Sequence, residues 1–228
     1  KTSNQTYNFL NVNTHTGATV IAGGSNSLLD GGSMLNTSSI TINYAHLGLN
    51  DNVNFALANR LSTSTPITMR GGTLVYTGRA QMETSQSVGA ITLVEGLNMI
   101  QAAPGGTGIN SATLNIVSLA RSVGSTATVR FPDNSVGAIG NTGNILIGNY
   151  NGPVGTNLTN NLIGPWAVVD REFASYIPQL GVIRLGQTGA AGYSTNVLNG
   201  TPLATDNIRA TASVGPLYQD TVVNTFTL

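Results

Sequence analysis

The chain contains no cysteine, so disulfide bonds, thiolate metal sites and thiol catalysis are excluded. Charged residues make up only 8% of its 228 residues, against about a quarter in an average soluble domain. Lysine occurs once, and the nine basic residues form no stripe or polybasic cluster, which argues against nucleic acid and anionic membranes as partners. No apolar run reaches the roughly 18 residues that a membrane-spanning helix needs.

Asparagine, threonine, serine and glycine supply the polarity that charged residues do not. Uncharged polar side chains can form hydrogen-bonded ladders along stacked strands, where like charges would repel one another. The same composition is poor in strong helix formers. It therefore favours a closely stacked, all-β fold.

An apolar–Thr–apolar triplet recurs along the first half of the chain. Three copies read ITI at 40–42, ITM at 67–69 and ITL at 91–93, and a looser fourth reads LNI at 114–116. Their spacing of roughly 23 to 27 residues is typical of stacked-repeat architectures. Since alternate side chains point to opposite faces, each triplet can bury its two apolar residues only when neighbouring copies stack on it. The repeat predicts a parallel β-helix, or β-solenoid.

The rest of the chain is expected to continue this architecture less regularly. We expect a single elongated β-solenoid domain over residues 1–228, with regular coils over 1–131 and looser coils with an aromatic cluster over 132–228. Dense Gly, Asn and Pro predict a small looser module around residues 132–185. One helix is expected over residues 53–61, where apolar side chains recur at a spacing of four.

The closest pair of carboxylates is Asp170 and Glu172. On a strand both would point to the same face, which is the arrangement of a polysaccharide-hydrolase dyad. The interpretation we favour is a solvated ion-pair patch beside an aromatic cluster. That cluster, Trp166, Phe173 and Tyr176, is either a sugar-stacking platform or a local hydrophobic core, and we favour the core.

Metal sites have little support in the sequence. His15 and His46 are the only histidines and lack the further ligands of a zinc site. Calcium would find oxygen ligands at residues 50–52 or 133–134, but the glycine-rich run at 105–110 does not complete a calcium-binding repeat. We therefore predict no catalytic residue, no cofactor and no metal, and we do not expect an enzyme.

The first and last predicted strands carry apolar residues that would serve as contacts between subunits. A solenoid leaves unpaired strand edges at both ends, and such edges can join head to tail or continue into neighbouring repeats of a longer chain. The start at Lys1, without an apolar leader, is what we expect of a processed protein or a segment of a longer one. The candidate contact residues are Tyr7, Phe9, Leu10, Val222, Phe226 and Leu228.

Several segments resemble one known family. The run NTHTGATVIAGG at 13–24, the segments 59–61 and 65–74, the segment 166–176 and the run ATDNIR at 204–209 are similar to the repeats of bacterial autotransporter-associated β-strand repeat proteins. His15 replaces the usual aromatic residue of that repeat. The resemblance implies a right-handed parallel β-helix in a large secreted or surface-anchored bacterial protein, and it brings no catalytic residues.

These observations lead to one main functional hypothesis. We expect a structural protein outside the cell or on its surface, which is a subunit or repeat of a fibre, stalk or sheath and stacks end to end. The alternative is an adhesin or carbohydrate-binding module with glycans as partners. A β-helix enzyme that degrades polysaccharide is the third hypothesis.

Overall fold

The computed structural model describes most of the chain in several stretches. These are residues 5–106, 111–132, 142–149, 161–178, 180–187, 192–193, 203–209, 223 and 225–227. The described residues form eighteen β-strands and no α-helix, in agreement with the expected all-β fold. None of them forms a helix long and apolar enough to cross a membrane.

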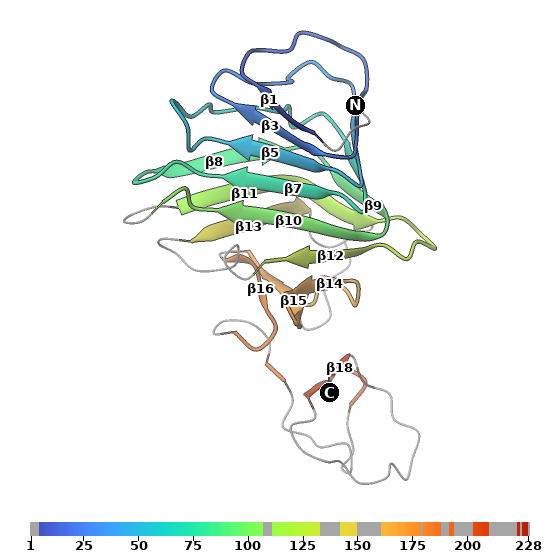
Figure 1. The fold of residues 1–228 in the computed structure, drawn as a ribbon. Helices are drawn as coiled ribbons and strands as arrows, with labels where there is room; N and C mark the ends of the chain where they lie inside the picture. Colours follow the sequence, from blue (N-terminus) through green and yellow to red (C-terminus); the bar gives the residue numbers. More distant parts are fainter. Residues whose placement is uncertain are drawn as a thin grey trace.

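The larger sheet has nine strands (Figure 1). They are β1 (Thr6–Phe9), β3 (Ser25–Leu29), β5 (His46–Asn50), β7 (Thr73–Thr77), β10 (Leu97–Ala103), β12 (Thr128–Phe131), β14 (Ala167–Val169), β15 (Glu172–Ile177) and β16 (Gly181–Arg184). In that order each strand is hydrogen-bonded to the next. All pairs from β1 to β14 are parallel.

The second sheet has seven strands, all paired in parallel. They are β2 (Thr19–Ala22), β4 (Ile40–Asn43), β6 (Ile67–Arg70), β9 (Ile91–Glu95), β11 (Ser111–Arg121) and β13 (Gly143–Asn149), in this order across the sheet, with β8 (Glu83–Val88) also paired to β11. From β1 to β14 the chain passes back and forth between the two sheets. This alternation of parallel strands is compatible with the predicted solenoid.

The recurring triplets form the centre of the seven-stranded sheet. Ile40 lies beside Ile67 and Ile67 beside Ile91, so the first three copies stack in register as predicted. The fourth copy was placed wrongly, because Leu119 and not Leu114 pairs with Ile91. Leu114 lies opposite Ile145 instead. Strand β11 is long enough to pair with β8 through its first half and with β9 through its second.

Stacking in register lines up the apolar side chains between the two sheets. In the nine-stranded sheet Leu28, Leu49, Tyr76 and Ala102 follow one another on successive strands, and each is fully buried. Full burial of one large apolar side chain contributes about 1.5–3 kcal/mol. A strand of four or five residues therefore gains most of its stability from the strands above and below it.

The expected helix over residues 53–61 is wrong. The structure has turns and irregular backbone there, ending in an isolated bridge between Leu61 and Met34. A short helix must repay a costly nucleus, and here side chains satisfy the backbone instead. The carboxylate of Asp51 accepts a hydrogen bond from the Leu57 amide, and Gln86 donates one to the Leu57 carbonyl.

The parallel arrangement stops after β14, which corrects the expectation of parallel coils throughout the second half. Strand β14 pairs in parallel with β12, whereas β14–β15 and β15–β16 are antiparallel. Val169 and Glu172 face each other, so only Asp170 and Arg171 connect the two strands. Such a short connection can join only antiparallel neighbours. Of the looser module expected over 132–185, residues 133–141, 150–160 and 179 lie outside the described residues.

Two further strands, β17 (Asn207–Arg209) and β18 (Thr225–Thr227), pair in parallel with each other in a separate sheet. The predicted final strand therefore belongs to neither of the two large sheets. Its pairing with β17 occupies one edge of this strand.

Candidate functional site

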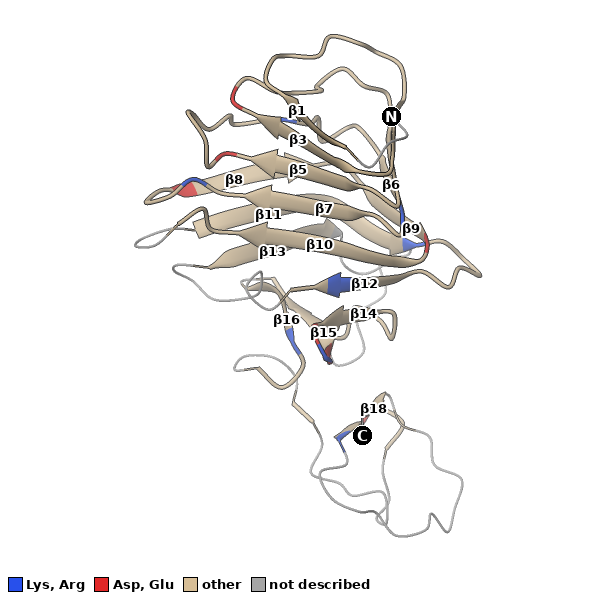
Figure 2. Cartoon of the chain, viewed as in Figure 1, with Lys and Arg blue, Asp and Glu red and all other residues tan. Residues whose placement is uncertain are grey.

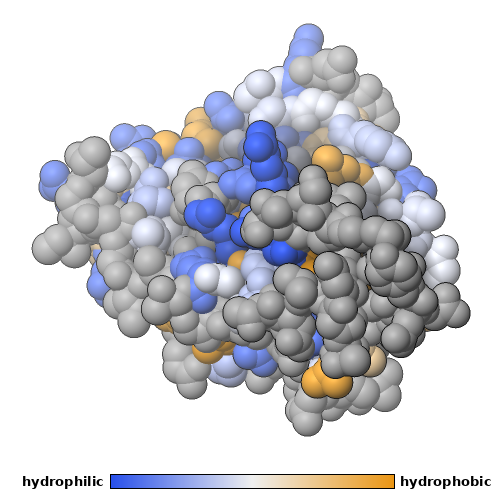
Figure 3. Space-filling model, turned by 90° about the horizontal axis from the view of Figure 1, so that it is seen from below, coloured by the Kyte–Doolittle hydropathy of each residue, from blue (hydrophilic) through white to orange (hydrophobic). Residues whose placement is uncertain are grey.

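Strands β12, β15 and β16 carry charged residues where the parallel stack gives way to the antiparallel strands (Figure 2). Arg130 comes from β12, Arg171 from the turn before β15, and Arg184 from β16, while Arg209 reaches in from β17. These are four of the eight arginines of the chain. The view from below shows hydrophilic side chains at the centre of this face (Figure 3).

Asp170 occupies the turn rather than a strand. Its backbone is left-handed, with φ of 52°, a conformation that aspartate tolerates better than most residues. One carboxylate oxygen accepts hydrogen bonds from Nε and Nη2 of Arg130, at 3.1 and 2.5 Å. The ion pair joins the turn between β14 and β15 to β12, a strand of the parallel stack.

Glu172 is engaged on a different side. Its Oε2 accepts hydrogen bonds from the hydroxyl of Tyr193 and from Nη2 of Arg209. The guanidinium of Arg209 also lies over the Tyr193 ring, 4.1 Å from its centroid. The premise of a dyad, Asp170 and Glu172 on one face of a strand, is therefore wrong, because Asp170 lies in a turn and each carboxylate is paired with its own arginine.

These charged groups surround a pocket of 730 Å³, which we call the arginine pocket. Its lining is Arg130, Val169, Asp170, Arg171, Glu172 and Arg184. The side chain of Arg171 is exposed at the tip of the turn. It forms no hydrogen bond or ion pair with any residue that the structure describes.

The three aromatic candidates are not presented together as a platform. Trp166 is partly buried against the core, and the guanidinium of Arg121 lies 6.0 Å from its ring centroid. Phe173 is half-buried in β15 opposite Val168. Tyr176 is 4% exposed, so its ring has no free face to offer a sugar.

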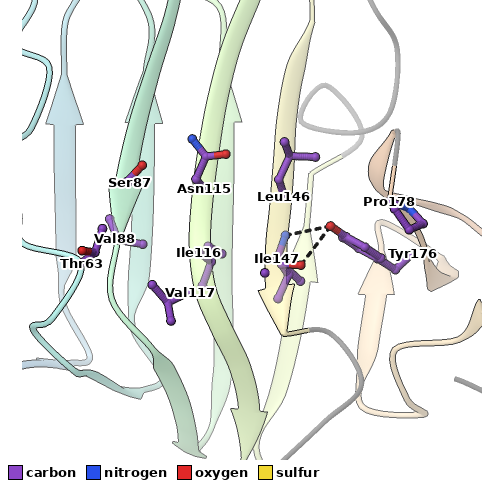
Figure 4. A pocket seen from close by; sticks show the side chains of 11 residues that line it. Thr63, Ser87, Val88, Asn115, Ile116, Val117, Leu146, Ile147, Tyr176 and Pro178 are labelled. Carbon is purple, nitrogen blue, oxygen red and sulfur yellow. Dashed lines mark hydrogen bonds between the residues drawn. The ribbon is translucent and has the colours of Figure 1, made fainter. Parts of the chain in front are cut away.

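Tyr176 instead forms hydrogen bonds with the backbone of β13, a role that the sequence did not predict. Its hydroxyl accepts a hydrogen bond from the Ile147 amide and donates one to the Ile147 carbonyl, both at 3.0 Å (Figure 4). Nearby, Gly181 has φ of +78°, and a Cβ there would lie 2.3 Å from the carbonyl oxygen of Ile145. Strands β15 and β16 thus close directly over the backbone of β13, the last strand of its sheet. We call this arrangement the C-terminal cap.

Beside the cap lies a smaller, largely apolar groove of 340 Å³ across β8, β11 and β13 (Figure 4). Ser87 and Asn115 contribute polar groups, while Val88, Ile116 and Ile147 contribute apolar ones. It contains no titratable side chain other than Tyr176. Its hydroxyl groups belong to Thr63, Ser87 and Tyr176.

At the opposite end of the stack, β1 has β3 as its one strand partner among the described residues, and its first three residues are exposed. Tyr7 and Leu10 are 43% and 47% exposed, whereas Phe9 packs partly against the core. Of the expected contacts at the other terminus, Phe226 lies in β18, and Val222 and Leu228 lie outside the described residues.

A buried ionic network, also missed from the sequence, supports the loop between β5 and β6. The side chains of Arg60 and Asp51 are 0% and 1% exposed. Nε of Arg60 donates a hydrogen bond to Oδ1 of Asp51 at 2.9 Å, and Nη2 of Arg60 lies 2.8 Å from the same oxygen. Nη1 donates to the carbonyl of Gly32 at 2.9 Å. Oδ2 of Asp51 accepts from Tyr76 at 3.1 Å and Gln86 at 3.3 Å. Burial raises the pKa of Tyr76, which keeps its hydroxyl protonated as a donor.

This network involves Asp51, the carboxylate of the first predicted calcium site. Both oxygens of Asp51 already accept hydrogen bonds, so residues 50–52 offer no uncommitted carboxylate. The second candidate, 133–134, lies outside the described residues. No group of three or more His, Cys, Asp or Glu in the described part of the chain is placed to hold a metal ion.

The two histidines lie in separate places. His15 contacts the hydroxyl of Thr19 at 2.8 Å, and Nδ1 of His46 lies 3.2 Å from the hydroxyl of Ser25. Burial lowers the pKa of His46. Among the described residues no ion pair joins a carboxylate to His46, so Ser25 and His46 form a polar contact between neighbouring strands.

No family, no curated protein and no solved structure matches this chain. Its function is therefore inferred from its own residues and their geometry. The three relevant features are the N-terminal edge, the C-terminal cap and the arginine pocket.

Proposed function

We propose that this chain is a structural, non-enzymatic β-solenoid of a bacterial cell surface or extracellular assembly, and that it forms part of a stalk by pairing its N-terminal edge with a second copy. The N-terminal edge is the backbone of β1 together with the exposed side chains of Tyr7 and Leu10. The in-register parallel strands of two sheets support the solenoid, and its handedness and family follow the resemblance of the repeats.

The contrast between the two ends carries the proposal. At one end, Tyr176 and Gly181 close over β13, where the Tyr176 hydroxyl bonds both the amide and the carbonyl of Ile147. At the other end β1 has a partner on one side only. An exposed strand edge readily adds another strand, unless charge, proline or a covering segment prevents it. Strand β1, with the sequence TYNF, has neither charge nor proline.

A second copy is the partner that suits this edge. Two copies related by a twofold axis would place β1 antiparallel to its own counterpart, which satisfies the main-chain groups of both. The contact is self-complementary in charge, because β1 and the neighbouring edge strand β2 contain no charged residue that would repel its copy. The apolar surfaces of Tyr7 and Leu10 would be removed from water by the same contact.

This proposal replaces head-to-tail stacking by head-to-head pairing. A head-to-tail filament needs two complementary open ends. Among the described strands, the cap covers β13 at the end opposite β1, the parallel order of the nine-stranded sheet stops at β14, and Phe226 is paired within the small sheet. A rod of two stacks, joined at their open ends and capped at both tips, follows.

Sedimentation velocity over a wide concentration range tests the proposal. We expect a species of twice the 23.5 kDa of one chain, elongated in negative-stain images. Tyr7→Lys together with Leu10→Lys should shift the equilibrium to monomer, since like charges would face each other across the twofold axis. Val123→Lys is the matched control, because Val123 is fully exposed in a distant turn. A chain that stays monomeric at all concentrations contradicts the proposal.

A further inference from the structure

The arginine pocket lies at the end of the molecule that the proposed pairing leaves free. Four arginines, Arg130, Arg171, Arg184 and Arg209, surround two carboxylates there. The cluster carries more positive than negative charge, in a chain whose formal net charge is zero. Three arginines and two carboxylates line the pocket itself, and Arg209 is paired with one of these carboxylates, so the local potential attracts anions.

The size and lining of the pocket indicate the kind of molecule that it would hold. Its 730 Å³ falls within the range of about 300–1,000 Å³ that is usual for small-ligand sites. Val169 is the only apolar residue in the lining. The pocket therefore suits a ligand that is polar over most of its surface.

The hydrogen-bonding groups in the pocket are of two kinds. Arg171 is exposed and makes no ion pair with a described residue, and Arg130 spends Nε and Nη2 on a single oxygen of Asp170. Guanidinium groups match the planar fork of a carboxylate, and they do so better than an ammonium group. Asp170 and Glu172 add acceptors, which suit hydroxyl donors. An acidic saccharide presents both carboxylates and hydroxyls, whereas an acidic peptide presents few hydroxyls.

We infer that the arginine pocket binds a saccharide bearing carboxylate groups, with Arg171 and Arg184 receiving a carboxylate and Asp170 and Glu172 accepting sugar hydroxyls. This site is separate from the N-terminal edge and does not depend on self-association. It would allow the capped end of the stalk to attach to an acidic polysaccharide.

Isothermal titration of the full chain with tetragalacturonate tests the inference. We expect saturable binding at low salt that weakens as salt is raised, because charge-assisted contacts are screened. Maltotetraose, which has the hydroxyls but no carboxylate, should not bind measurably. A sulfated oligosaccharide and an oligoglutamate of equal charge should bind more weakly than tetragalacturonate.

Variants locate the binding. Arg171→Ala should weaken binding by about tenfold to a hundredfold, which corresponds to one charged hydrogen-bonding group. Arg171→Lys should give an intermediate loss, because it keeps the charge and loses the fork. Arg70→Ala removes an arginine on β6, outside the pocket lining, whose side chain is 40% exposed, and it should leave binding unchanged. Arg184→Ala provides a second test within the pocket.

Several results would overturn the inference. These are no binding of tetragalacturonate, equal binding of maltotetraose, or full affinity in both Arg171→Ala and Arg184→Ala. Tighter binding of the sulfated oligosaccharide or of oligoglutamate would overturn the assignment of a carboxylated saccharide. Far-ultraviolet circular dichroism and a melting curve for each variant separate lost binding from lost folding.

Discussion

The hydroxyl of Tyr176 closes the edge of the seven-stranded sheet by bonding both the amide and the carbonyl of Ile147. The end strand of a parallel stack has unpaired backbone N–H and C=O groups on its outer edge, and a further strand can pair with them. Here one side chain replaces two of the hydrogen bonds that a further strand would make. The same fold leaves the edge of β1 without an equivalent.

Tyr176→Phe should destabilise the protein by about 1–3 kcal/mol, the cost of leaving a buried donor and acceptor without partners. Urea denaturation measures the free energy of unfolding. Tyr44→Phe is the control, since Tyr44 is 66% exposed and should tolerate the change. Equal stability of the two variants would mean that the hydroxyl does not support the cap.

Asp51→Asn should cost about 3–5 kcal/mol, because it leaves the guanidinium of Arg60 buried without its counter-charge. Glu95→Gln breaks the exposed pair with Arg70, whose side chains are about 40% accessible, and should cost at most about 1 kcal/mol. Chemical denaturation of both variants gives the comparison. If the two substitutions cost the same, the buried network does not hold the loop.

The free energy of unfolding should decrease as the pH is lowered through 6.5, the ordinary pKa of histidine. Burial lowers the pKa of folded His46, so the unfolded chain takes up a proton first, and protonation then favours unfolding. Below the lowered pKa this contribution levels off. Melting curves from neutral to mildly acidic pH should show a decline that His46→Gln reduces and His15→Gln retains. An unchanged decline in His46→Gln would assign it to other groups.

Gly89→Ala should destabilise the fold by about 1–3 kcal/mol, as overpacking does elsewhere. A Cβ at Gly89 would lie 1.9 Å from the carbonyl oxygen of Thr65 in the neighbouring turn of chain. Gly17→Ala is the matched control, since a Cβ there meets nothing within 4 Å. Thermal denaturation distinguishes them, and a neutral Gly89→Ala would show that the two segments can move apart.

Local alternation and spacing were enough to predict the stacked strands. The Ile-Thr-Ile pattern specifies which side chains turn inward, and its recurrence specifies which strands become neighbours, so the register of the first three triplets followed from the sequence. The fourth triplet failed because β11 is long enough to pair with two strands, and length beyond the triplet is not part of the pattern. The helix at 53–61 failed because a spacing of four does not reveal that Asp51 and Gln86 bond the backbone there.

The candidate site was foreseen only in part. Asp170 and Glu172 were recognised as a close pair of carboxylates, but the turn that places Asp170 outside a strand depends on the pairing of Val169 with Glu172. Arg130 lies forty residues from Asp170, and Arg209 lies 37 residues from Glu172. Nothing local in the sequence connects these pairs.

Composition and periodicity alone determined that this chain would stack short parallel strands around an apolar interior, because alternation and repeat length act between adjacent strands. The tertiary structure alone decided where stacking stops, which edge is closed and where the arginines meet. Those outcomes depend on contacts such as Tyr176 with Ile147 and Arg60 with Asp51, whose partners are distant in the chain or hidden in an irregular loop. Their energies arise only once the chain has brought them together.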